Sequence, residues 1–441
     1  MNSLIDIRLE SNRYQKINFK GGNLSSDAGL LLIKEFVSKL GFDKLVKSNF
    51  KTKDKAIFRR HQDAENLWQM IYQIIGAYYQ DDCADELTND PIMTGILQKS
   101  ALASQPTISR FFGRMGEDTL EQLHKITREM RRRVYAVKPP SFVLLDLDST
   151  LLDTYGKQEG EGFNYHYQSH GYHPLVCYDG MTGDLLDIKL REGTKYSSNG
   201  VVEFLQPVLD EFDEDYPDVK LLLRGDSGFA VPGLYEQCEE SGVSYVIRLK
   251  SNHLLTKHAS HIADKLTERT KENQVDYAVE YGEFIYQAGS WDRPRRVVCK
   301  VEKPANQMIH MYTFIVTNMS SNPQKLIRLY CKRGKMENFI KESKNGFDFS
   351  AVSSSAMLTN ANRLMVHALA YNLFNWFRRV TLPTKMRKLR VNTLRLKLLK
   401  VAVKTIRSSR YITFKLCSSF PYKDAFCETL QNIRRLEPLL E

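Results

Sequence analysis

The sequence predicts a mixed α/β fold built around a central sheet. Apolar runs typical of buried strands alternate with amphipathic helical patterns between residues 141 and 250. Two of these runs, Phe142–Leu145 and Val219–Leu223, lead directly into segments that contain aspartates. A hydrophobic content of 42% is that of a globular protein, and 441 residues are enough for two or three domains.

The chain is basic, with 63 Lys and Arg against 52 Asp and Glu, which favours a polyanionic partner. Its seven cysteines are scattered and never form a Cys-x-x-Cys pair, which argues against a disulfide scaffold and a structural zinc site. No signal segment opens the sequence, and no apolar run approaches the ~18 residues of a membrane span. We therefore expect a cytoplasmic protein with no membrane partner.

Residues 1–138 are predicted to form a helical N-terminal region that binds nucleic acid. One of its helical patterns begins with Gln105-Pro-Thr-Ile-Ser-Arg110, which resembles the recognition segment of a helix-turn-helix. An ordinary capped helix in a bundle is the alternative. Arg110 is the candidate contact residue. The helices are expected at about 30–40, 64–79, 91–98, 107–115 and 119–135.

Residues 139–252 are predicted to form the first part of an RNase H-like core. Pro139-Pro140 separates them from the helical region. The expected order is three antiparallel strands, a helix, a strand, a helix and a strand, and the first and fourth strands of such a fold lie side by side. We place these elements at about 142–145, 172–178, 185–190, 199–212, 219–223, 231–240 and 244–250.

Carboxylates follow the first and fourth of these strands. Asp146 and Asp148 alternate with Leu147, so both point to one face. Asp226 lies between glycines that allow close approach of a ligand. A buried carboxylate is costly unless a metal or another partner satisfies it, although a simple strand-ending turn is the alternative. The fifth strand carries Arg248 and Lys250.

A β-rich insertion is predicted at residues 253–319. It begins with a helical stretch at about 253–272, and strand-like runs follow at 275–279, 284–287, 296–301 and 311–316. Trp291 is a candidate for stacking on an unpaired base. Packing of this ring under its own hairpin remains the alternative.

Residues 320–379 are predicted to complete the core. Tyr330, Arg333, Glu337 and Lys344 have a spacing that would align them on one face of a single helix. One acid flanked by basic and phenolic groups suits a metal-binding carboxylate that faces a phosphate. An amphipathic helix with a solvated charged face is the alternative. A further helix is expected from about Asn362 to Arg379.

Residues 380–441 are predicted to form a basic helical tail that contacts the DNA backbone. No acidic residue occurs from Phe349 to Lys423, and basic residues alternate with leucines between Arg378 and Arg410. Binding to a membrane surface is the alternative. A rival metal site formed by His166, His170 and His173 is disfavoured, because their surroundings have a loop and strand pattern.

Three motifs carry a resemblance to a known family. The Tyr-x2-Arg-x3-Glu-x6-Lys pattern, the segment around Asp148 and the Arg224–Phe229 segment resemble the DDE transposases of bacterial insertion-sequence family 1380. The resemblance covers most of the chain. It implies that Asp148, Asp226 and Glu337 are catalytic and hold two Mg²⁺ ions, with Mn²⁺ able to substitute. Asp146 is the alternative first aspartate.

The resemblance also implies a function. Tyr330, Arg333 and Lys344 would hold DNA phosphate, with Arg suited to bidentate contact. The protein would bind the terminal inverted repeats of a mobile element and its target as a homodimer or higher oligomer. Water would attack first, and the freed 3′-OH would then attack target DNA. A catalytically silent DNA-binding protein and a nuclease without strand transfer are the alternatives.

Overall fold

The computed structural model describes residues 6–437, apart from 55, 57, 274–276, 306 and 308. The chain forms two compact units. One contains Met1–Val137, Gly346–Ala351 and Met365–Glu441, and the other contains Lys138–Asn345 and Val352–Leu364. Across the described ranges, no helix combines the length and apolar character that crossing a bilayer requires.

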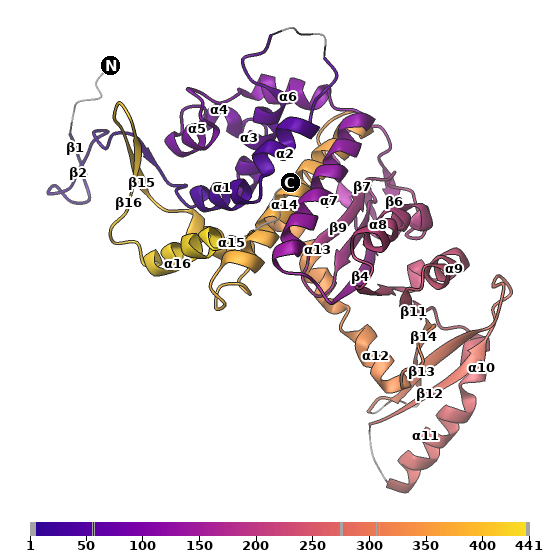
Figure 1. The fold of residues 1–441 in the computed structure, drawn as a ribbon. Helices are drawn as coiled ribbons and strands as arrows, with labels where there is room; N and C mark the ends of the chain where they lie inside the picture. The colour runs from indigo at the N-terminus through magenta and orange to yellow at the C-terminus, as the bar shows by residue number, and fades with distance from the viewer. Residues whose placement is uncertain are drawn as a thin grey trace. The chain divides into compact units, whose positions relative to one another are not determined.

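An eight-stranded sheet forms the centre of the second unit, in the order β12-β13-β14-β11-β10-β4-β8-β9 (Figure 1). Strands β4, β10 and β11 are parallel, and β8 and β9 continue the sheet antiparallel beside β4. The predicted mixed α/β architecture with a large central sheet is confirmed. The bounds are β4 Phe142–Ser149, β8 Leu175–Asp179, β9 Leu185–Lys189, β10 Lys220–Gly225 and β11 Ser244–Leu249.

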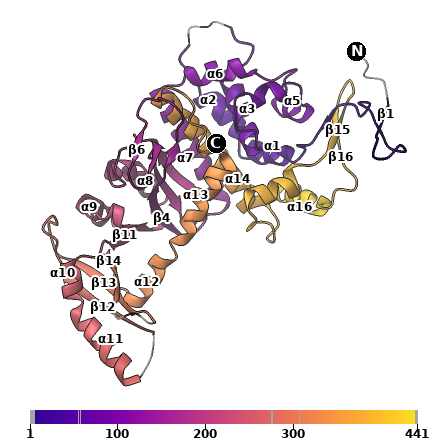
Figure 2. The same ribbon diagram turned by 180° about the vertical axis from the view of Figure 1, so that it is seen from behind.

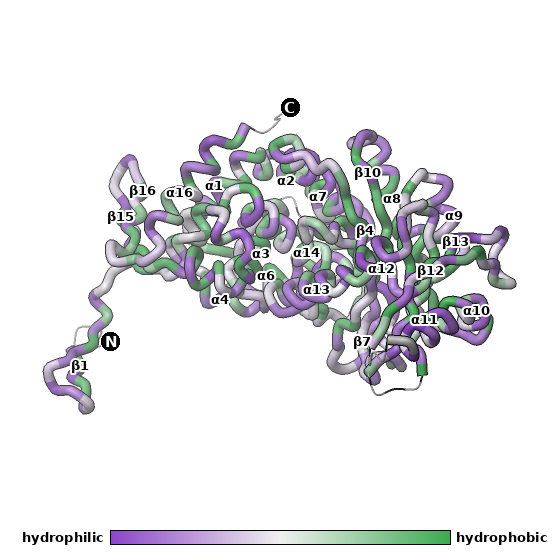
Figure 3. The backbone as a smooth tube through the Cα atoms, turned by 90° about the horizontal axis from the view of Figure 1, so that it is seen from below, coloured by the Kyte–Doolittle hydropathy of each residue, from purple (hydrophilic) through white to green (hydrophobic). Residues whose placement is uncertain are grey.

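Alternation of side chains gives this sheet two different faces. Leu144 of β4 packs in one apolar cluster with Leu222 of β10 and with Leu326 and Ile327 of helix α12 (Pro323–Cys331). Asp146 and Asp148 follow Leu144 at steps of two, so they point to the same face as this cluster. Apolar character runs along the central strands, as the green segments of β4 and β10 show (Figure 3).

The opposite face is covered by α9 (Pro232–Glu240), beside which α8 (Val201–Asp215) packs. The ring of Tyr245 in β11 stacks on the ring of Tyr235 in α9, with centroids 5.5 Å apart. Helix α8 connects β9 to β10, and helix α9 connects β10 to β11. A helix was predicted between the strands of each pair. The two helices bring the ends of β4, β10 and β11 to one edge of the sheet.

The β-rich insertion extends the core sheet. Its last strand, β14 (Met311–Thr317), pairs antiparallel with β11, and β13 (Arg295–Lys303) and β12 (Ala278–Tyr286) follow outward. The two short strands predicted before residue 288 are one strand, β12, and the predicted start at Val275 lies outside the described residues. Helices α10 (His253–His258) and α11 (Ser260–Asn273) lie beside these strands, as Figure 2 shows.

The single helix predicted over residues 329–344 is wrong. Helix α12 ends at Cys331, and α13 (Gly334–Phe347) begins after a turn at Lys332 and Arg333. Gly334 has a low helix propensity, and the Arg333 side chain is drawn away by contacts with β4. Tyr330 and Arg333 therefore do not share a helix with Glu337 and Lys344.

The first unit is mainly helical. The five helices predicted within residues 1–138 are present there, and helices α2 and α4 of the same region were not predicted. Gly41 was interpreted as a helix end, and its left-handed backbone (φ +70°) indeed separates α1 from α2. The bounds are α1 Leu30–Lys39, α2 Phe42–Asn49, α3 Asp63–Ile75, α4 Cys83–Glu86, α5 Pro91–Leu97, α6 Gln105–Gly113 and α7 Glu117–Val137.

The basic helix predicted across Arg378–Arg410 forms only in part. Helix α14 (Met357–Thr381) ends before Pro383, which cannot continue it. Short helical turns follow at α15 (Val391–Leu394) and η2 (Arg395–Leu399), and the β-branched residues beyond them form a hairpin. The hairpin consists of β15 (Val403–Arg407) and β16 (Ile412–Leu416). Helix α16 (Lys423–Arg434) follows it.

Arg395 shows that part of this basic charge is structural. Its buried guanidinium donates to the carbonyls of Ile75 at 2.8 Å and Ile74 at 3.0 Å. These carbonyls belong to the last turn of α3, where helix carbonyl groups lack intrahelical partners. Arg395 therefore caps a helix and is not available to DNA.

Candidate active site

Two aspartates lie in matching positions at the ends of neighbouring parallel strands. Asp146 of β4 is the register partner of Arg224 of β10. Asp148 lies two residues after Asp146, and Asp226 lies two residues after Arg224. Strand alternation therefore directs these aspartates to the same face as Asp146 and Arg224. The ends of β4 and β10 thus bring together residues that are far apart in sequence.

Asp146 is committed to a buried ion pair. Its two carboxylate oxygens accept from Nε and Nη2 of Arg224, both at 2.6 Å, and the two side chains are 0% and 1% exposed. Arg224 also donates to the Leu329 carbonyl at 2.8 Å, which joins β10 to α12. This pair leaves Asp146 no free oxygen directed to solvent and favours Asp148 as the first aspartate of the site.

Asp148 is partly exposed and held by Arg333. Its carboxylate lies 2.9 Å from Nη2 of Arg333, its side chain is 17% exposed, and it accepts from the Ser149 amide at 2.9 Å. Burial, the largest cause, and the nearby charge of Asp226 raise the pKa of Asp148 to about 6, against the lowering effect of Arg333. Asp226 is therefore close enough to affect the ionisation of Asp148.

Asp226 is fixed by the turn that follows β10. Its Oδ1 accepts from the Gly228 amide at 2.8 Å as the N-cap of the short helix η1 (Ser227–Phe229). A second oxygen remains for another partner. The glycine at 228 permits this close turn, since a Cβ there would lie 3.0 Å from the Asp226 carboxylate.

Arg333 supplies positive charge beside both aspartates. Besides the ion pair with Asp148, its Nη2 donates to the Leu147 carbonyl at 3.0 Å. Burial lowers the pKa of this guanidinium, but the charges of Asp148 and Asp226 more than offset that effect and raise it above its usual value. The side chain is 15% exposed, so it lies at the edge of the site.

Glu337 does not join the two aspartates in this structure. It lies exposed in the first turn of α13. Across the part of the chain that the structure describes, no three His, Cys, Asp or Glu side chains gather as a metal-binding group. The structure therefore brings Asp148, Asp226 and Arg333 together and places Glu337 outside this cluster.

The other residues of the Tyr/Arg/Glu/Lys pattern have separate roles. Burial raises the pKa of Tyr330, and the charges of Arg333 and of Arg248, which lies on the strand next to β10, lower it. Lys344 donates to the Leu151 carbonyl at 2.7 Å, and burial lowers its pKa. Arg248 and Lys250 are both exposed. Tyr330 and Arg248 thus border the aspartates, whereas Lys344 anchors α13 to the segment after β4.

The family of the chain follows from comparison with known proteins. The model of the family described as "Transposase DDE domain group 1" matches residues 7–438. The chain belongs to this transposase family. No curated protein matches the sequence.

Two solved transposase structures resemble the fold. The piggyBac transposase synaptic complex with hairpin DNA is 13% identical, covers 95% of this chain and 86% of its own, and has a TM-score of 0.46. The Mos1 transposase paired-end complex with the left transposon end is also 13% identical. It covers 52% of this chain and 77% of its own, with a TM-score of 0.18.

The aspartate pair of this transposase domain fits a divalent cation. DDE transposases generally use such ions. Asp148 and Asp226 offer hard carboxylate oxygens, which Mg²⁺ prefers over imidazole or thiolate. Burial raises the pKa of Asp148 to about 6 although the charge of Arg333 lowers it, so a further positive charge would favour the ionised carboxylate. A cation bound by both aspartates would supply this charge.

Tyr167 is a residue of the site that sequence reasoning missed. It lies in the turn between β6 (Gly162–Asn164) and β7 (Ser169–Tyr172), and its hydroxyl donates to the Ser149 carbonyl at 3.2 Å. Burial and the charges of Asp148 and Asp226 raise its pKa to about 12. The ring is 40% exposed, so it borders both the aspartates and solvent. The sequence predicts a loop and strand pattern for this segment and does not indicate a site residue there.

The neighbouring histidines form no metal site. His170 contacts Glu161 at 2.9 Å, and the ring of His173 contacts the Lys195 carbonyl at 2.7 Å. His166 packs edge-on against Tyr167. The three histidine rings therefore have separate partners in this structure.

Trp291 is packed in the protein and is only 8% exposed. Its ring lies edge-on to Tyr235 and Tyr286, each with centroids 5.4 Å apart, and the Arg295 guanidinium lies over it at 5.8 Å. This packing matches the alternative stated for Trp291 from the sequence, and it leaves no open ring face for an unpaired base.

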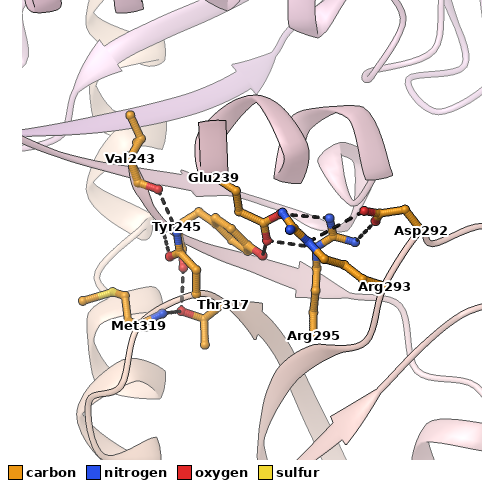
Figure 4. A network of polar contacts seen from close by, with 9 residues as sticks. Glu239, Val243, Tyr245, Asp292, Arg293, Arg295, Thr317 and Met319 are labelled. Carbon is orange, nitrogen blue, oxygen red and sulfur yellow. Dashed lines mark hydrogen bonds and ion pairs between the residues drawn. The ribbon is translucent and has the colours of Figure 1, made fainter. Parts of the chain in front are cut away.

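A polar network holds the turn between β12 and β13, which contains Trp291 (Figure 4). Glu239 of α9 accepts from Arg295 at 2.9 Å to each oxygen, from Tyr245 at 2.7 Å, and from Arg293. Burial alone would raise the pKa of Glu239, but these donors lower it to about 2. The network ties the β12–β13 turn to α9 and so fixes the insertion to the core sheet.

Arg110 lies on an exposed helix surface in the first unit. Helix α6 buries Ile108, Phe111 and Phe112, and it leaves Ser109 and Arg110 exposed. The helix predicted for a recognition segment is therefore present, with its polar residues accessible. Its role in binding DNA stays a prediction.

Proposed function

We propose that this protein is a DNA transposase that cleaves the ends of a mobile element and joins them to target DNA. The observation that carries the proposal is the convergence of Asp148 and Asp226 at the ends of β4 and β10, with Arg333 beside both. Membership of the DDE family supports the same reaction class. The order β9-β8-β4-β10-β11 supports an RNase H-like core for it.

Asp148, Asp226 and Glu337 are the proposed catalytic and metal-binding residues, with Mg²⁺ as the natural ion and Mn²⁺ as a substitute. Bound divalent cations would activate the attacking oxygen and stabilise the leaving one. Glu337 lies four residues after Arg333, in the first turn of α13. Its participation rests on the matched sequence pattern, because this structure places it outside the cluster.

Arg333 is proposed to change partners during the reaction. In the structure its guanidinium neutralises Asp148. A DNA phosphate presented at this edge offers oxygens that match the planar guanidinium in two hydrogen bonds. Tyr330, together with Arg248, lies at the same edge and would orient the backbone. Lys250 directly follows the strand of Arg248, β11, and would add charge to this path.

The finer assignment is to insertion-sequence family 1380, with terminal inverted repeats and target DNA as the substrates. The motifs around Asp148, Asp226 and Glu337 support it. Both solved relatives are described as complexes with transposon DNA, which fits a DNA partner for this chain. We propose a homodimer or higher oligomer as the state that pairs two ends.

A joining assay tests the function directly. The full chain would be incubated with labelled DNA carrying the sequences that flank its gene, a supercoiled plasmid and Mg²⁺. A transposase releases the element end and joins it to the plasmid. A nuclease of the same fold gives cut ends without joined product, and a silent DNA-binding protein gives a shifted band with neither product.

A further inference from the structure

The hairpin β15–β16 in the first unit has one packed face and one exposed face. Register pairs along it are Val403 with Leu416, Thr405 with Phe414 and Lys404 with Lys415. Val403 and Thr405 are buried, and the ring of Phe414 packs against Gly95 of α5. Strand β3 (Leu24–Ser25) pairs with β15 on its other side, so the hairpin is fixed to the unit.

Every residue on the other face is exposed. Cross-strand partners lie on the same side of a hairpin, and the alternation therefore collects one set of six side chains there. The set is Lys404, Ile406, Ser408, Tyr411, Thr413 and Lys415. We call this set the outer hairpin face. Arg407 and Arg410 are also exposed at the turn beside it.

The charge arrangement on the outer hairpin face is unfavourable in isolation. Lys404 and Lys415 are direct cross-strand partners, and like charges in that position repel each other. Among the salt bridges of the described residues, none involves either lysine. The sequence has no acidic residue between Phe349 and Lys423, so no nearby carboxylate in this stretch offsets the repulsion.

We propose that the outer hairpin face binds the sugar–phosphate backbone of double-stranded DNA. Phosphates placed between Lys404 and Lys415 would turn the repulsion into two attractive contacts and release counterions. The Tyr411 hydroxyl lies at the turn end of the same face, where it can donate to a phosphate oxygen, whereas the Ser408 hydroxyl donates to the Tyr411 carbonyl at 3.2 Å and holds the turn. The identity of the partner rests on the proposed function, whereas the surface itself rests on exposure and charge.

The test measures binding of the full chain to a duplex of arbitrary sequence at several salt concentrations. The variant K404Q/K415Q should weaken binding to all duplexes and reduce the slope of log K against log salt by about 1.8, or about 0.9 for each lost phosphate contact. The matched control is K220Q/K265Q, which removes two exposed lysines that lie outside the residues assigned to DNA binding. This control should keep the slope of the unmodified chain.

A second variant separates binding from folding. Lys404→Glu creates an attractive cross-strand pair with Lys415, so its thermal unfolding midpoint should equal or exceed that of the unmodified chain. Its DNA affinity should nevertheless fall below that of Lys404→Gln. Together these results would show that the lysine pair serves binding at the expense of stability.

Three outcomes would overturn the inference. They are an unchanged slope for K404Q/K415Q, an equal loss in the K220Q/K265Q control, and, in a parallel assay, a loss of binding to vesicles containing an anionic lipid with no loss of duplex binding. A different result bears on the proposed function. If the unmodified chain binds no duplex at any salt concentration, the transposase assignment fails, whereas intact binding that ignores the hairpin variants contradicts this surface alone.

Discussion

The Arg333 guanidinium lies 2.9 Å from the Asp148 carboxylate, and its charge also acts on Asp226. The side chain reaches β4 from the turn between α12 and α13, which is why the predicted continuous helix is broken there. A basic residue of the sequence pattern thus contacts Asp148, the first of the proposed catalytic carboxylates.

Removing Arg333 should shift the pH at which Asp148 ionises. Asp148 titrates at about pH 6, and Arg333 lowers this pKa, so Arg333→Gln should raise it. Binding of Mn²⁺ needs the ionised carboxylate, and the midpoint of a pH titration of Mn²⁺ binding should move upward in the variant. An unchanged midpoint would show that the ion pair has no influence on the site.

Gly180 should be intolerant of any side chain. A Cβ there would lie 2.3 Å from Oδ2 of Asp146 and would push apart the buried pair with Arg224. Gly180→Ala should lower the free energy of unfolding by about 1–3 kcal/mol or more. Gly289→Ala is the control, because nothing lies within 4 Å of the added atom. Urea denaturation of both variants makes the comparison, and equal stability would contradict the packing.

Glu239 should make folding acid-sensitive. Its pKa is about 2 in the folded chain, below its ordinary value of 4.5. Because the folded pKa is lowered, the stabilisation is present above about pH 4.5 and is lost as pH falls toward 2. The free energy of unfolding should therefore fall more steeply between these pH values in the unmodified chain than in Glu239→Gln. Parallel pH profiles would argue that the network of Figure 4 contributes nothing.

Trp291→Ala should act on stability. The ring is nearly buried between two tyrosines and Arg295, and loss of such a ring costs about 3–5 kcal/mol. Strand joining per folded molecule should be unchanged. A stable variant that stalls after the first nick would instead revive the role in base stacking.

The central sheet could be predicted from the sequence because its strands are continuous apolar runs with carboxylates at their ends. That rule placed aspartates at both strand ends, and the family resemblance favoured Asp148 over Asp146. The break at Arg333 could not be predicted, since it depends on a tertiary contact with Asp148 that helical spacing does not contain. The same limit applies to Tyr167, which approaches the aspartates only through the β6–β7 turn.

Asp146 shows a different limit of sequence reasoning. Alternation places Asp146 and Asp148 on one face, and composition does not distinguish them. Their partners do, because Arg224 lies opposite Asp146 in the register.

In the basic tail, leucine spacing suggested a helix. Pro383 and the β-branched residues within 401–406 favour a hairpin instead.

The account depends most on Asp148 and Asp226 acting as one unit with Glu337, and one assay tests it most directly. Cleavage and joining of element ends would be measured in Mg²⁺ for Asp148→Asn, Asp226→Asn and Glu337→Gln, with the exposed Asp218→Asn as the control. Each of the three should bind ends normally yet lose roughly 10³-fold or more of both activities, and double variants should lose no more. Asp218→Asn should retain both activities. Normal cleavage by Asp148→Asn or Asp226→Asn would contradict the account.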